Sequence, residues 1–147
     1  MGIWWRRLTG LVAAALVTTA LASLGHSFMV QRELTALGVE IGFGTRLVTA
    51  GRDFIGLAPS FGAIVSAALL IAFVVAGLLK QRAGALAPVA YPLAGWVAVL
   101  LALLAMRLAF GFSPLAGART MAGFLLISLS GLVGGAVYAF VAQRRGL

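Results

Sequence analysis

Three ionisable side chains stand inside or beside long apolar runs of this chain: His26, Asp53 and Arg107. A histidine exchanges a proton near neutral pH, a carboxylate holds a proton or a cation, and a guanidinium binds anionic groups. Together they have the chemistry of a proton-handling site or of a ligand-binding site. Whether the three side chains meet depends on the elements that carry them.

The composition assigns those elements to a membrane. Of the 147 residues, 63% are hydrophobic and 10% are charged, whereas soluble proteins average about 25% charged residues. Four apolar runs are long enough to cross a hydrocarbon core, which takes roughly 20 residues of helix. We therefore predict an all-α membrane protein, a four transmembrane helix bundle that forms a single domain over residues 1–147. The predicted spans are 8–30, 57–79, 91–112 and 120–142.

The sequence lacks the residues that several kinds of site require. The chain has no cysteine, which excludes disulfides, thiolate metal sites and iron–sulfur clusters held by its own residues. His26 is the single histidine, so we predict no metal site and no cofactor. The net charge of +8 does not predict binding to nucleic acid, because the basic residues stand at the ends of the apolar runs.

The distribution of charge predicts the orientation. One side of the bundle carries six cations and no acid, and the other carries four arginines with all three acids. The six cations are Arg6, Arg7, Lys80, Arg82, Arg144 and Arg145. Because positive residues mark the cytoplasmic side, we expect a multi-pass inner-membrane protein in contact with lipids, with both termini cytoplasmic. The first run also fits a signal peptide cleaved after Ala20-Leu21-Ala22, but we expect it to be retained.

The longest part of the chain outside the spans is residues 31–53. Its pattern predicts an amphipathic segment at the outer interface, with a first helix that ends at Gly38. We expect the chain to turn into the second span around Pro59.

The predicted topology brings the candidate residues to one depth. Arg107 lies about 22 Å along the third span from Pro92, near the outer boundary, and Asp53 enters the second span at the same level. A charge inside the membrane costs at least about 2.5 kcal/mol, which favours a function, although Arg107 could also extend to the headgroups. Arg107, Arg52, Arg46 and Arg119 are all possible ion-pair partners of Asp53. A pair with Arg107 would join the second and third spans, as a tether or as part of a ligand site. The candidate outer-face cluster is His26, Arg46, Arg52, Asp53, Arg107 and Arg119.

Small residues predict how the helices pack. The fourth span has a track of Ser128, Gly131, Gly135 and Ala139, and the first span has a looser one that begins at Gly10. Such tracks let helices approach closely in lipid, where hydrophobicity alone drives no association. They could close one four-helix unit or face a second copy, so we expect a homo-oligomer or a membrane-protein partner.

Two resemblances bear on the family. The stretches GHS at 25–27, GRDFIGLAPSFG at 51–62 and SPLAGARTMAGFLL at 113–126 resemble small, mostly uncharacterised bacterial four-helix inner-membrane proteins, a resemblance that implies no activity. DFIGLAP also resembles the N-F-x-E-x-x-P signature of the membrane-associated glutathione transferase and eicosanoid (MAPEG) family. Asp53 stands at the signature's Asn, and Gly56 at its Glu. That resemblance implies a trimeric transferase of glutathione, with the Arg107 region at the end of its third helix.

The function expected first is a structural, accessory or ligand-binding role at the periplasmic interface, with residues 31–53 as the contact region. The alternatives are a MAPEG-like membrane glutathione transferase and a small oligomeric channel or transporter. The glycine-rich fourth span permits the last of these without requiring it.

Overall fold

Four long helices make up the computed structural model, which describes residues 2–82, 84–113 and 115–143. Each is long and apolar enough to cross a membrane, which confirms the all-α prediction. The two links after α2 and α3 each contain a short 3₁₀ turn, η1 (Gly84–Leu86) and η2 (Ala116–Ala118). The helices are α1 (Ile3–Ala36), α2 (Phe43–Lys80), α3 (Ala90–Phe110) and α4 (Met121–Gln143).

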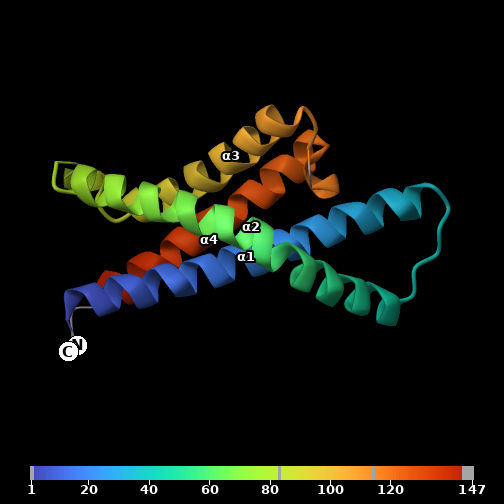
Figure 1. Ribbon diagram of the computed structural model, residues 1–147, viewed down its shortest axis with the longest axis horizontal. Helices are drawn as coiled ribbons and strands as arrows, with labels where there is room; N and C mark the ends of the chain where they lie inside the picture. The colour runs from blue at the N-terminus through green and yellow to red at the C-terminus, as the bar shows by residue number, and fades with distance from the viewer. Residues whose placement is uncertain (1, 83, 114, 144–147) are drawn as a thin grey trace.

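The helices pack side by side around α4. In Figure 1, α4 lies along α1, α3 lies against α4, and α2 crosses the bundle. The start of α1 and the end of α4 lie at one end of the bundle, which we call the terminal end. The link between α1 and α2, and η2, lie toward the other end, which we call the hairpin end. Arg144 and Arg145, on which the predicted orientation partly rests, are outside the described residues.

The segment predicted between the first two spans is part of the helices themselves. α1 continues to Ala36, and α2 begins at Phe43, so only a short link joins them. Gly38 adopts a left-handed φ of 84°, which turns the chain away from α1 as predicted. We call residues 31–53 the outer hairpin, because they are the end of α1, the link and the first turns of α2.

The predicted turn at Pro59 is wrong. Pro59 lies inside α2, which continues without interruption to Lys80. A proline removes one backbone hydrogen bond and disfavours a helix in water. Helices that cross a membrane tolerate proline, and α2 is long and apolar enough to be one.

The small-residue tracks pack within the chain. Cβ atoms built on Gly131 and Gly95 would each overlap the other's carbonyl oxygen, so α3 and α4 touch backbone to backbone at this pair. Gly134, on another face of α4, lies against Thr18 of α1. Gly10 of the first track lies against Ala142 near the end of α4. The tracks therefore close one four-helix unit, the first of the two alternatives that the sequence left open.

The buried face of α1 is unusually polar. Thr18, Thr19, Ser23 and Ser27 are all buried inside the bundle rather than on its outer surface. The hydroxyl oxygens of Thr18 and Ser23 have no hydrogen-bond partner within the described part of the chain. Small hydroxyl residues permit close helix contact while they keep polar atoms out of the hydrocarbon, which explains their position against α4 and α2.

Candidate functional site

Asp53 bonds to α1 and not to α3. Its carboxylate accepts a hydrogen bond from the Ser27 hydroxyl, with 2.5 Å between Oδ2 and Oγ. Ser27 is buried, and Asp53 is half-buried. Hydrogen bonds to an ionised acceptor are roughly twice as strong as neutral ones, so this contact holds α2 against α1.

His26 joins α1 to the link before α4. The backbone N–H of Gly117, in η2, donates to His26 Nδ1 over 3.1 Å. An Nδ1 that accepts a hydrogen bond places the ring proton on Nε2 in the neutral side chain. The link also packs closely here, because a Cβ on Gly117 would meet the His26 backbone. A glycine at this position therefore allows the contact.

The two contacts form one cluster at adjacent residues of α1. His26 holds η2, Ser27 holds α2 through Asp53, and the Asp53 carboxylate also interacts electrostatically with His26. Three elements thus meet at one point near the hairpin end. The geometry fits the tether that the sequence predicted for Asp53, but with α1 as the partner in place of α3. We call His26, Ser27, Asp53 and Gly117 the tether cluster.

The predicted ion pair between Asp53 and Arg107 is not formed. Arg107 is exposed in the last turn of α3, and among the described residues it has no hydrogen-bond or ion-pair partner. A cation in the last turn of a helix is stabilised by the helix dipole, and its long side chain can reach the headgroups. The extension to the headgroups that was considered for Arg107 therefore agrees with its position.

The other arginines of the predicted outer-face cluster also lie apart from Asp53. Arg52 and Arg119 are exposed and have no partner within the described residues. Arg46 is exposed and donates from Nε to the Ile41 carbonyl oxygen over 3.2 Å, a contact inside the outer hairpin. Of the six predicted residues, the structure thus brings together only His26 and Asp53.

Sequence reasoning missed two members of the tether cluster, Gly117 and Ser27. Ser27 belongs to a row of hydroxyl residues spaced four apart on α1, with Thr19 and Ser23. Residues four apart share one face of a helix, so this spacing was a readable signal of a buried polar face. Trp96 of α3, whose indole N–H donates to Ser128 Oγ over 3.1 Å, was missed as well.

Comparisons with known proteins return no relative. No family model matches the chain, and no curated protein and no solved structure matches it.

Replacing His26 tests its part in the tether cluster. His26→Ala is expected to lower the free energy of unfolding by about 1 kcal/mol, because the buried Gly117 N–H loses its acceptor. His26→Asn should cost less, since its amide oxygen can take the place of Nδ1. Denaturation in mixed detergent micelles measures both. Equal losses for alanine and asparagine would show that the ring's packing matters and the hydrogen bond does not.

Proposed function

We propose that this is a multi-pass inner-membrane protein with both termini cytoplasmic, and that it acts as an accessory protein. In this proposal the outer hairpin, residues 31–53, binds another membrane protein at the periplasmic face. The tether cluster serves that role structurally, since it fixes the two helices of the hairpin at its base.

The observation that carries the proposal is the uncovered apolar surface of the outer hairpin. Leu37 is 80% exposed, Phe43 is 78% exposed and Leu47 is 59% exposed, and Val48 is exposed beside them. Charged side chains of both signs, including Glu40 and Arg46, lie on the same segment. Apolar residues with a polar rim are typical of a protein contact surface.

The lengths of α1 and α2 support a position outside the hydrocarbon. The helices have 34 and 38 residues, or about 51 and 57 Å at 1.5 Å per residue, against a hydrocarbon core of about 30 Å. Their excess at the hairpin end carries Arg32 and Arg46, which are costly in lipid. The exposed apolar side chains of the outer hairpin would therefore be available to a partner at the interface.

Two hydrogen bonds hold the outer hairpin together. Gln31 Nε2 donates to the Arg46 carbonyl oxygen over 3.3 Å, across the two helices. The Val39 N–H donates to the Leu34 carbonyl oxygen over 3.1 Å, which closes the end of α1. A surface held in place before binding loses less conformational entropy when a partner docks.

A photo-crosslinking amino acid at Leu47 tests the proposed contact in cells. We expect a discrete crosslinked band that contains one other membrane protein, and we expect Phe43→Ser to weaken it several-fold. The matched control is the same amino acid at Leu16, which is 60% exposed on the spanning part of α1 and should crosslink to lipid. Crosslinks from Leu47 to lipid alone, or only to a second copy of this chain, would contradict the accessory role.

Single cysteines test the proposed orientation. Because the chain has no cysteine of its own, Thr45→Cys and Gln81→Cys each provide one reactive thiol at an exposed position. We expect a membrane-impermeant maleimide to label Thr45→Cys in intact spheroplasts and Gln81→Cys only after permeabilisation. The opposite pattern would place the outer hairpin in the cytoplasm and overturn the proposal.

A further inference from the structure

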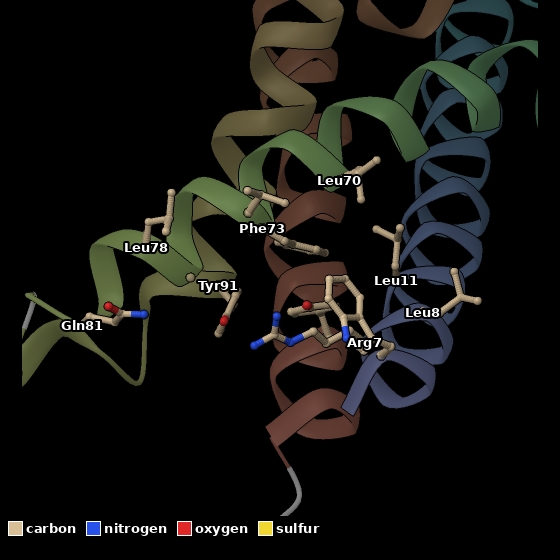
Figure 2. Close-up of a pocket in the computed structure, with 12 residues that line it drawn as sticks. Arg7, Leu8, Leu11, Leu70, Phe73, Leu78, Gln81 and Tyr91 are labelled. Atoms are coloured by element: carbon tan, nitrogen blue, oxygen red, sulfur yellow. The ribbon is translucent and has the colours of Figure 1, made fainter. Parts of the chain in front are cut away.

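A cavity of about 430 Å³ opens at the terminal end of the bundle, which is the end opposite the outer hairpin (Figure 1). Figure 2 shows it between α1 and α2, with Tyr91 of α3 at its side. Its volume is within the range of about 300–1,000 Å³ that is typical of small-molecule sites. The cavity is separate from the tether cluster and shares no residue with it.

The walls of the cavity are apolar and open toward lipid. Leu8 and Leu11 come from α1, and Leu70 and Val74 come from α2. Leu70 and Val74 are 51% and 57% exposed, so the cavity is accessible from the side of the bundle that faces the hydrocarbon. An apolar chain can therefore enter it from the bilayer and pack between the two helices.

The floor of the cavity is a rigid aromatic group. The rings of Phe73 and Tyr138 stack with centroids 4.2 Å apart, and the Tyr91 ring lies 5.0 Å from Tyr138. These rings join α2, α3 and α4, so the cavity has a fixed base. Such aromatic contacts stabilise the packing beyond the area that they bury.

The mouth of the cavity is polar and positively charged. Figure 2 shows the Arg7 guanidinium reaching from α1 toward the Tyr91 hydroxyl, with Gln81 at the opposite wall. The Lys80 ammonium lies 5.4 Å from the centre of the Tyr91 ring. Arg7 has no hydrogen-bond or ion-pair partner among the described residues. All three acids of the chain lie between residues 33 and 53, so none neutralises this mouth.

We propose that this cavity binds an anionic phospholipid, with the phosphate at Arg7 and one acyl chain along the leucine walls. Arg7 precedes the first apolar run and Lys80 follows the second, which places both at the headgroup level in either orientation of the bundle. A guanidinium matches the geometry of a phosphate, and tyrosine and glutamine supply further donors. The proposal does not depend on the accessory role of the outer hairpin.

Native mass spectrometry of the full-length protein, in a neutral detergent, tests the site. We expect phosphatidylglycerol to remain bound at concentrations where phosphatidylcholine of the same chain length does not. Arg7→Gln is expected to weaken phosphatidylglycerol about fivefold to tenfold, since one cation near an anionic headgroup contributes about 1 kcal/mol or more. Arg6→Gln is the matched control, because it removes the same charge from the adjacent residue, which does not line the cavity.

A second variant tests whether the lipid occupies the cavity itself. Gly77 lines the cavity, and a Cβ built on it would meet the Tyr91 hydroxyl at an ordinary 3.4 Å. Gly77→Leu should fill the space and weaken phosphatidylglycerol without loss of thermal stability. Inorganic phosphate, added as a competitor, should displace little phosphatidylglycerol if the acyl chain of the lipid contributes to binding.

Three results would overturn the proposal. If Arg6→Gln and Arg7→Gln weakened the binding of phosphatidylglycerol equally, the lipid would be attracted by general surface charge and not by this cavity. Displacement by millimolar inorganic phosphate would show a site for free phosphate. Equal retention of phosphatidylcholine would show an apolar site without selection for charge.

Discussion

Gly131→Ala is expected to lower the free energy of unfolding by about 1–3 kcal/mol, the usual cost of overpacking a tight contact. The added methyl group would overlap the carbonyl oxygen of Gly95, which is backbone and cannot rotate away as a flexible side chain can. Relief therefore requires α3 and α4 to separate. That separation would also disturb the hydrogen bond between Trp96 and Ser128, which joins the same two helices.

Gly56→Ala is the matched control for Gly131→Ala. Gly56 lies inside α2, where an added Cβ meets nothing within 4 Å. Alanine has the higher helix propensity by about 1 kcal/mol, so the same chemical change should be neutral or stabilising there. Denaturant titration in mixed micelles measures both variants. A destabilisation at Gly56 equal to that at Gly131 would mean that the close contact of α3 and α4 is not the cause.

Gly95 provides a further test of the same contact. Gly95→Ala should cost a similar amount, and the double variant should cost less than the sum of the two. Once one methyl group has separated the helices, the second meets less resistance. Residues in contact are expected to show such coupling, whereas distant ones add. Strict additivity would indicate that the two glycines do not face each other.

The fold could largely be predicted because lipid leaves a chain few alternatives. An apolar run of about 20 residues must satisfy its backbone internally, and a helix does so. This rule predicts the four long apolar helices that the structure contains. At Pro59, the residue preferences of soluble proteins predict a turn, but α2 continues through it. The amphipathic pattern of residues 31–53 predicts a separate interfacial segment, whereas in the structure residues 31–36 end α1 and residues 43–53 begin α2.

The tether cluster was harder to predict than the fold. Depth along each span placed His26 and Asp53 at one level, and the structure does bring them together. Depth does not give the rotation of a helix about its own axis, however, and rotation decides which side chains meet. The favourable charge of Arg107 suggested it as the partner of Asp53. The packing of α1 against α2 makes Ser27, a neutral residue, the partner of Asp53. Ser27 belongs to a row of buried hydroxyl residues, and such a row indicates which face of α1 turns into the bundle.

Ser27→Ala is expected to lower the free energy of unfolding by about 1.5–3 kcal/mol, the range for a hydrogen bond to a charged group. The lower end is the better expectation, because Asp53 is only half-buried and water can reach its carboxylate. Asp53→Asn should cost less than Ser27→Ala, since its amide oxygen still accepts from the hydroxyl. In the Ser27→Ala background, Asp53→Asn should have almost no further effect on the free energy of unfolding.

Charge reversal distinguishes this contact from the ion pair that the sequence suggested. If Asp53 paired with Arg107, the combined Asp53→Arg and Arg107→Asp variant would recover much of the stability that either change loses. The structure predicts no recovery, because Arg107 is exposed and has no partner among the described residues, whereas Asp53 is bonded to α1. Arg107→Asp alone should be nearly neutral in micelles. A coupling above about 1 kcal/mol between the two reversals would require α3 to approach α2 at this level, and the tether cluster would then need a fourth element.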